Sequence, residues 1–148
     1  MIEKVRVIKE DEFNSLLSLY AYLNLDDPVL EVDETLKKHW NEIISNPDYF
    51  YLVAEEDGIL VSTCNLTVIR NLTRAARPYG LIENVVTHPD YRKRGYGTAV
   101  LKKAVEIARD HDCYKVMLLT SQKDDATLDF YQHAGFSQGE KTGFIVRM

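Results

Sequence analysis

One stretch near the middle of the chain limits the available folds more than any other. Residues 82–99 read IENVVTHPDYRKRGYGTA, a β-prone run that passes through a turn into cations and glycines and then into a helical pattern. The first turn of a helix has four backbone N–H groups without intrahelical partners, and the helix dipole makes that end positive. Gly95 and Gly97 remove side chains that would keep an anion away from these donors. The stretch therefore predicts a phosphate site between a strand and a helix.

Three cations precede the first of these glycines. Arg92, Lys93 and Arg94 suit a polyphosphate better than a single carboxylate. The spacing matches neither the Walker loop nor the dinucleotide fingerprint. Two structural alternatives are a helix start whose glycines only permit the turn, and a solvated basic face. The strand before and the helix after favour phosphate binding.

Hydrophobic periodicity predicts the order βααβββαβαβ along the whole chain. We expect a strand over residues 2–8, helices over 10–23 and 33–46, strands over 50–55 and 59–69, a polar loop over 71–78, a strand over 80–87, a helix over 96–111, a short strand over 114–120, a helix from 124 or 125 to 133, and one or two strands over 136–148. The strand over 114–120 is nearly all apolar, which predicts burial on both faces. This order predicts one α/β (α+β) domain over residues 1–148, with a mixed central sheet flanked by about four helices.

Composition excludes several classes of protein. A chain of 148 residues has the size of one domain, and its net charge of −5 argues against a nucleic-acid binder. It has neither a signal-peptide pattern nor an apolar run long enough to span a membrane, so we expect a cytoplasmic protein. Cys64 and Cys113 lie too far apart for a disulfide framework or a Cys-based zinc site, although one bridge between them stays open. The histidines have no metal-site spacing, and we expect no metal.

Two motifs resemble the GNAT superfamily of acetyl-CoA-dependent N-acetyltransferases. Arg92-x-x-Gly95-x-Gly97 matches the family's Arg/Gln-x-x-Gly-x-Gly/Ala motif and follows a strand that ends in VVTHP. Residues 124–136, DDATLDFYQHAGF, resemble the family's second conserved block, which ends Tyr-x-x-x-Gly-Phe. The order of elements matches as well, so the resemblance covers essentially the whole chain.

The resemblance implies roles for individual positions. Backbone N–H groups of residues 94–98 would hold the pyrophosphate of CoA, a backbone N–H near Val86 would hold the acetyl carbonyl, and Tyr131 would protonate the departing thiolate. Asp124 departs from the family's frequent Asn, and we interpret it as a helix cap, because a carboxylate repels phosphate. The cofactor-binding residues implied in this way are Val85, Val86, Thr87, Arg92, Lys93, Arg94, Gly95, Tyr96, Gly97 and Thr98.

In this family the acceptor amine usually attacks the thioester directly. An amine with a lysine-like pKa of about 10.4 must first lose a proton. Glu83 is the candidate base, because it interrupts an apolar strand just before the acetyl-binding segment; the alternative is an outward-facing strand residue. The alternative to a catalytic role for Tyr131 is that it packs as a buried aromatic side chain beside Phe130. We expect only one of these two side chains to face the cofactor. Cys113 is better explained as a small buried thiol than as a nucleophile.

The acceptor and the partners are less constrained. We expect acceptor choice to lie in the first two helices and in the loops near Asn71 and the C-terminus. Residues 82–86 and 112–116 and Arg147 resemble glucosamine-6-phosphate N-acetyltransferases, but Asn84 replaces an Asp, and the acidic residue after the next strand is missing. Four arginines are candidates to meet an anionic acceptor: Arg70, Arg74, Arg77 and Arg147.

Several alternatives stay open on the sequence alone. A polyamine, an amino acid, an antibiotic amine or a peptide amine is an equally admissible small-molecule acceptor, and the chain also leaves homodimer formation open. A non-catalytic acyl-CoA sensor on the same fold is the alternative to an enzyme, since fold and cofactor site do not establish turnover. A module that binds nucleic-acid phosphates through Arg92–Arg94 is the least favoured class.

Overall fold

A five-stranded mixed sheet forms the centre of the protein. The computed structural model describes residues 5–148, and its strands are β1 (Val5–Val7), β2 (Tyr49–Glu56), β3 (Ile59–Ile69), β4 (Tyr79–Thr87) and β5 (Val116–Leu118). They lie in the order β1-β2-β3-β4-β5. The first four are antiparallel neighbours, and β5 joins β4 in parallel. Asp57 and Gly58, both at positive φ, form the β2–β3 hairpin turn.

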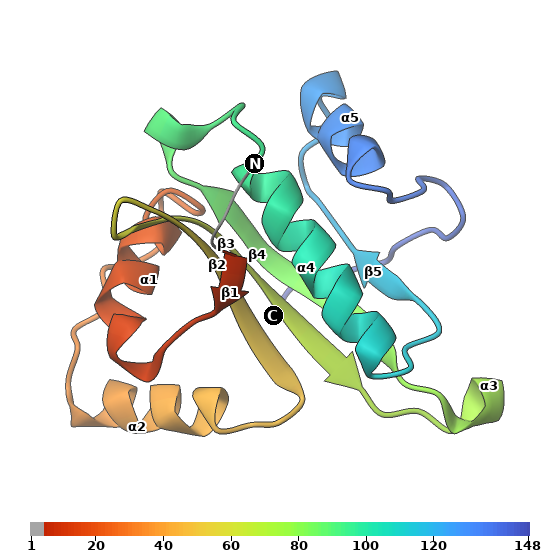
Figure 1. Ribbon diagram of the computed structural model, residues 1–148, viewed down its shortest axis with the longest axis horizontal. Coiled ribbons are helices and arrows are strands. Elements are labelled where there is room, and N and C mark those ends of the chain that lie inside the picture. Colours follow the sequence, from red (N-terminus) through yellow and green to blue (C-terminus); the bar gives the residue numbers. More distant parts are fainter. Residues whose placement is uncertain (1–4) are drawn as a thin grey trace.

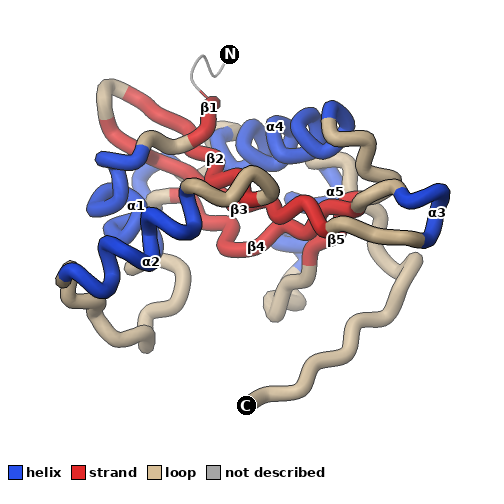
Figure 2. The backbone as a smooth tube through the Cα atoms, turned by 90° about the horizontal axis from the view of Figure 1, so that it is seen from below, coloured by secondary structure: helices blue, strands red, loops and turns tan. Residues whose placement is uncertain are grey.

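Helices cover both faces of this sheet (Figures 1 and 2). α1 (Phe13–Tyr20) and α2 (Glu34–Ile44) lie on one side, and α4 (Tyr96–Asp110) and α5 (Asp125–His133) lie on the other. A single turn, α3 (Thr73–Ala76), projects beyond the far end of β4. None of the helices in the described part of the chain is long and apolar enough to cross a membrane.

Two hydrophobic cores hold the layers together. Under α4 the core includes Leu66, Ile82 and Leu101; under α1 and α2 it includes Leu19 and Trp40. The indole N–H of Trp40 donates to the Glu10 carbonyl at 2.9 Å, which satisfies the polar group of a nearly buried side chain. The sheet is thus packed on both faces along β2 and β3, which contribute side chains to both cores.

The predicted fold class is confirmed, and most of the predicted elements are present. The caps at Asp33 and Asp124 are both formed: their carboxylates accept from the backbone N–H groups of Leu36 and Thr127 at 2.9 and 3.0 Å. The first helix is shorter than predicted, because residues 10–12 form a 3₁₀ turn and the helix ends at Tyr20. The predicted loop over 71–78 contains α3. Residues 2–4 of the first predicted strand lie outside the described residues.

Two predictions near the C-terminus are wrong. The strand predicted over 114–120 is confined to Val116–Leu118 and is only half-buried, because it is an edge strand. The strands predicted over 136–148 are absent: this segment contains no helix or strand, Phe136 is half-buried against the core, and Phe144, Ile145, Val146 and Met148 are exposed. Hydrophobic pattern predicts a strand, but a strand also needs a neighbour to pair with.

Candidate active site

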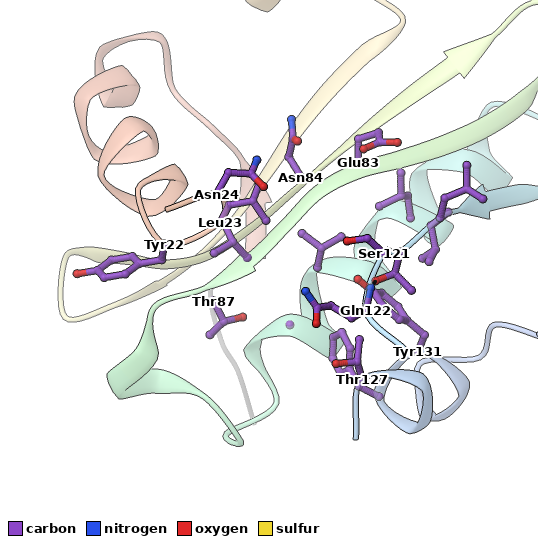
Figure 3. Close-up of a pocket in the computed structure, with 18 of the residues that line it drawn as sticks. Tyr22, Leu23, Asn24, Glu83, Asn84, Thr87, Ser121, Gln122, Thr127 and Tyr131 are labelled. Carbon is purple, nitrogen blue, oxygen red and sulfur yellow. Dashed lines mark hydrogen bonds between the residues drawn. The ribbon is translucent and has the colours of Figure 1, made fainter. Parts of the chain in front are cut away.

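A cleft opens where β4 and β5 separate. Their pairing ends at Ile82 and Leu118, whereas β4 continues to Thr87. The cleft has a volume of about 1310 Å³ and is lined by β4, the loop before α4, the end of β5, α5, the segment after α1 and the C-terminal segment. Figure 3 shows side chains from both strands and from α5 around this opening. An extended ligand can therefore lie along β4 where no strand partner does.

A bulge in β4 produces the separation. Asn84 has a φ of 54°, and one residue of β3, Cys64, faces two residues of β4 between the pairs Thr63–Val86 and Asn65–Glu83. Ile82 packs in the core under α4, whereas Val86 packs in the core under α1. In a regular strand, residues four positions apart point to the same face of the sheet. The bulge between Ile82 and Val86 therefore makes the side chains at the end of β4 point to the opposite faces from those that a regular strand would give. The acetyl-binding residues proposed from the sequence lie directly after this reversal.

Free backbone donors form the second part of the site. Lys93 and Gly95 have φ values of 61° and 90°, and α4 begins immediately afterwards. Among the described residues, none accepts from the backbone N–H groups of residues 93–98; the first satisfied N–H is that of Ala99, which donates to the Gly95 carbonyl at 3.0 Å. Consecutive donors around left-handed residues make an anion-binding concavity. The predicted anion loop thus has the donors that the prediction requires.

The three cations of this loop have different orientations. Arg92 and Lys93 line the cleft, and Arg92 Nε donates to the Thr87 carbonyl at 3.3 Å. Arg94 is not among the lining residues: it lies 3.7 Å from a Glu56 carboxylate oxygen and over the Tyr91 ring. The Tyr96 hydroxyl donates to the same carboxylate, which raises the pKa of Tyr96. Glu56 therefore holds the start of α4 to the end of β2.

Gly97 has a packing role that the sequence did not reveal. It is buried, and a Cβ built on it would lie 2.9 Å from Phe130 Cζ and 3.3 Å from Thr87 Oγ1. Thr87 in turn shares a hydrogen bond with Ser62 at 2.8 Å. The prediction that Gly97 is small to admit a phosphate is incomplete, because a larger residue would first collide with α5.

Tyr131 and Glu83, the two predicted catalytic residues, both line the cleft (Figure 3). Burial raises the pKa of the half-buried Tyr131, and the nearby Cys64 and Glu83 raise it further. The phenol therefore stays protonated at neutral pH and is able to donate. Glu83 is solvent-exposed on β4. Both Phe130 and Tyr131 line the cleft, so the expectation that only one of them faces the cofactor stays a prediction.

The predicted acceptor-binding residues are mostly elsewhere. Only Arg147 of the four arginines lines the cleft. Arg70 pairs with Asp48 at 3.1 Å, Arg77 pairs with Asp112 at 3.2 Å, and Arg74 lies over the Tyr114 ring. Neither α2 nor the loop near Asn71 contributes lining residues. The cleft lining therefore gives no support to a role of these two regions in acceptor choice, which stays a prediction.

Residues from two further segments line the cleft, and of these Tyr22 and Leu23 fall within the first predicted helix, where acceptor choice was expected, whereas the others were not predicted. They come from the segment after α1 and from the loop after β5: Tyr22, Leu23, Asn24, Ser121 and Gln122. No local motif marks them, since they meet only in the folded chain. The Tyr22 hydroxyl lies 3.3 Å from His88 Nε2, which joins the segment after α1 to the end of β4.

The cysteines are not positioned for nucleophilic catalysis. Both are free thiols. Burial raises the pKa of Cys64 to about 12, and it also raises the pKa of Cys113. A thiol must ionise to act as a nucleophile. Within residues 5–148 no group of three or more His, Cys, Asp or Glu side chains is arranged to hold a metal ion.

The fold and the site define a class of protein. A mixed sheet whose parallel strands separate beside a helix start with free backbone N–H groups is the arrangement of an acyltransferase that takes its acyl group from a CoA thioester. The family model described as the acetyltransferase (GNAT) family matches residues 15–136. The chain belongs to this family and is an N-acetyltransferase.

Individual relatives agree with this assignment. Glucosamine 6-phosphate N-acetyltransferase of Trypanosoma brucei brucei is 31% identical over 140 residues, which cover 93% of this chain and 91% of that protein. A solved structure from Agrobacterium tumefaciens str. C58, provisionally described as an acetyltransferase, has a TM-score of 0.92 at 43% identity and covers 99% of this chain and 100% of its own. Glucosamine-6-phosphate N-acetyltransferase from Arabidopsis thaliana has a TM-score of 0.75 at 26% identity, with 97% of each chain covered.

Proposed function

We propose that this protein transfers the acetyl group of acetyl-CoA to the primary amine of a small molecule, by direct attack within a ternary complex. The observation that carries the proposal is the cleft itself: the free N–H groups of residues 93–98 lie at one end, and Tyr131 and Glu83 lie along it. The donors suit a pyrophosphate, and the end of β4, which has no partner on its β5 side, suits an extended pantetheine arm.

The donor site uses the residues predicted from the sequence. Backbone N–H groups of residues 94–98 bind the pyrophosphate, and Arg92 and Lys93 add positive charge beside it. Val85, Val86 and Thr87 run beside the pantetheine arm. A backbone N–H near Val86 stabilises the charge that develops on the thioester oxygen. Arg94 contributes through its backbone, because its guanidinium faces Glu56.

The proposed reaction exchanges a carbon–sulfur bond for a carbon–nitrogen bond, and it requires two protons to leave the acceptor nitrogen and one to reach sulfur. Glu83 takes a proton from the ammonium form of the acceptor, directly or through water. The free amine nitrogen then bonds to the thioester carbon, the carbon–sulfur bond breaks, and its electron pair stays on sulfur. Tyr131 gives its phenolic proton to the thiolate, and the phenolate regains a proton from the newly acylated nitrogen, which leaves a neutral amide; Glu83 releases its proton to solvent. No acyl-enzyme is formed, consistent with the burial of Cys64.

The first acceptor to test is glucosamine 6-phosphate. Its support is the function for which the trypanosomal and plant relatives are named, together with Arg147 in the lining of the cleft. Two departures from those enzymes stand against it: Asn84 replaces an Asp, and residues 119–121 lack the acidic residue that is expected after this strand. An amino group on another small molecule fits the same chemistry.

A panel assay tests the proposal. CoA release is measured with glucosamine 6-phosphate, glucosamine, a polyamine, amino acids, an aminoglycoside and a peptide amine, with an amine-free control. We expect one class of amine to accelerate release, with intersecting initial-rate lines typical of a ternary complex. Glucosamine and its 6-phosphate differ only by the phosphate, so their ratio reports an anion subsite. If acetyl-CoA binds but no amine accelerates release, the protein is an acyl-CoA sensor and the proposal fails.

A further inference from the structure

The connection between α1 and α2, residues 22–32, forms part of the cleft at its start. Tyr22, Leu23 and Asn24 line the cleft and are called the α1 wall below. Figure 3 draws Leu23 and Asn24 between Tyr22 and the labelled side chains of β4. Leu23 is half-buried, whereas the rest of the connection is exposed. An exposed connection has a fixed position only where it is bonded to the body of the protein.

A hydrogen bond to His88 ties the α1 wall to the sheet. The Tyr22 hydroxyl lies 3.3 Å from His88 Nε2, and the two rings meet edge to face with their centroids 4.9 Å apart. Within residues 5–148, no other hydrogen bond or ion pair joins residues 22–32 to the sheet or to the loop before α4. The position of the α1 wall therefore depends on where the imidazole of His88 is held.

The imidazole of His88 is held by the turn that it precedes. The backbone N–H of His88 donates to the Val61 carbonyl at 2.8 Å, which continues the pairing of β4 with β3. Its Nδ1 accepts from the backbone N–H of Asp90 at 3.1 Å and caps the 3₁₀ turn Pro89–Tyr91. Because Nδ1 accepts, the neutral ring carries its proton on Nε2, so Nε2–H donates to Tyr22. One tautomer of His88 thus satisfies both partners.

The capped turn leads directly into the anion loop, residues 93–98. The ring of Tyr91 meets His88 at right angles, with centroids 5.3 Å apart, and lies 6.3 Å from the ring of Tyr96 at the start of α4. Tyr91 and Tyr96 line the cleft, whereas His88 is not among the described residues that line it. His88 therefore contacts both the α1 wall and the approach to the anion loop without facing the cleft itself.

We propose that His88 is a positioning residue that sets the spacing between the two sides of the cleft, with Nδ1 fixing the turn before the anion loop and Nε2 fixing the α1 wall through Tyr22. The proposal rests on the proposed function, because it takes the α1 wall as acceptor-binding and the anion loop as acetyl-CoA-binding. Since the two nitrogen atoms belong to one rigid ring, neither side moves without straining the bond that holds the other.

Two substitutions separate the roles of the ring nitrogens. His88→Asn places an amide oxygen near the position of Nδ1 and keeps the cap, but it has no donor at the position of Nε2. His88→Gln places an amide NH₂ group near the position of Nε2 and keeps the bond to Tyr22, but it has no acceptor at the position of Nδ1. We expect His88→Asn to raise the acceptor KM by about threefold to tenfold, with kcat and acetyl-CoA affinity near wild type. We expect His88→Gln to weaken acetyl-CoA binding by about fivefold, with the acceptor KM near wild type.

Calorimetric titration measures acetyl-CoA affinity, and initial rates with glucosamine 6-phosphate, or with the amine of the panel that accelerates CoA release, give the acceptor KM. Tyr22→Phe keeps the ring and removes the hydroxyl, so it is expected to raise the acceptor KM as His88→Asn does. The double variant is expected to be no worse than His88→Asn alone. His39→Asn, at an exposed position of α2 outside the cleft, is the control and is expected to change neither constant. Equal losses of both constants in His88→Asn and His88→Gln, or effects that multiply in the double variant, overturn the proposal, because His88 then only packs.

Hydrogen exchange tests the link without any assay of activity. The backbone N–H groups of Tyr22 and Leu23 donate to the carbonyls of Leu19 and Tyr20, each at 3.0 Å. Loss of the link to His88 is expected to speed exchange at these two amides by about threefold in Tyr22→Phe and His88→Asn, but not in His88→Gln. Unchanged exchange in all three variants overturns the proposal. If no amine of the panel accelerates CoA release, the proposed function fails, while the exchange rates still decide whether His88 holds the α1 wall.

Discussion

A Cβ built on Gly97 would lie 2.9 Å from Phe130 Cζ, so α4 and α5 pack closely because residue 97 is a glycine. Gly97→Ala is expected to lower the free energy of unfolding by about 1–3 kcal/mol, because the added methyl group overpacks this contact. Urea unfolding measures the change. Phe130→Leu in the same chain removes ring atoms and is expected to recover part of the loss, so the two changes are not additive. Strict additivity would show that the collision is relieved elsewhere.

Gly95 tests the anion loop with a matched control. It has a φ of 90°, and Gly139, outside the cleft, has a φ of 88°. Alanine at either position carries a similar backbone strain of about 1 kcal/mol. Only Gly95→Ala re-aims the free N–H groups of residues 93–98, so we expect it alone to weaken acetyl-CoA binding, by about tenfold. Calorimetric titration of both variants makes the comparison, and equal affinities would contradict the assignment of the loop.

Local rules predicted the parts of the site that lie close together in the sequence. The positions of Val100, Leu101 and Ala104 predict the buried face of α4, and all three are buried. The glycines before them predict the helix start with its free donors. The caps at Asp33 and Asp124 follow from residue type and position alone. In each case the deciding interactions span only a few residues.

Features that depend on distant contacts were not predictable in the same way. The arginines near α3 look suited to an anionic acceptor, yet Arg70 and Arg77 pair with Asp48 and Asp112, which are remote in the sequence. The bulge at Asn84 left one signal, since Asn tolerates positive φ, but its effect depends on which core each side of β4 meets. The C-terminal segment was mispredicted for a similar reason, because its hydrophobic pattern predicts a strand but does not indicate whether another strand is available to pair with it.

Tyr131→Phe tests the proton donor. Loss of a general acid is expected to lower kcat by about 10²-fold or more, with little change in acetyl-CoA affinity, because the ring stays in place. Tyr79→Phe lies outside the cleft and is the control for loss of a hydroxyl. Because burial raises the pKa of Tyr131, the wild-type rate is expected to hold through mildly alkaline pH. Equal losses in kcat and in affinity would indicate a packing role instead.

Glu83→Gln tests the base through its pH dependence. The variant cannot accept the ammonium proton, so its rate is expected to follow the fraction of acceptor that is already a free amine. The deficit relative to wild type is therefore largest at low pH and shrinks as pH rises toward the pKa of the acceptor. Profiles of kcat/KM for both proteins measure this. Glu106→Gln, an exposed position on α4, is the control, and a deficit that is constant with pH would assign Glu83 to acceptor binding.

Cys64 makes stability sensitive to alkaline pH. Burial raises its pKa to about 12, whereas in the unfolded chain a thiol titrates near about 8.5. Above that value the unfolded state loses the proton first, so the folded state loses its advantage as pH rises toward 12. Between pH 8 and pH 10 the loss in the free energy of unfolding that is due to Cys64 amounts to about 2 kcal/mol.

Between pH 8 and pH 10 the free energy of unfolding of Cys64→Ala is therefore expected to fall by about 2 kcal/mol less than that of wild type. This difference does not depend on how much the substitution itself destabilises the protein at pH 8. The buried tyrosines titrate in both proteins, so they cancel in the comparison. Urea unfolding under reducing conditions supplies the measurement, with Cys113→Ala as control, because Cys113 is less buried and its pKa is less displaced. Parallel losses in wild type and Cys64→Ala would mean that the thiol of Cys64 reaches solvent in the folded protein.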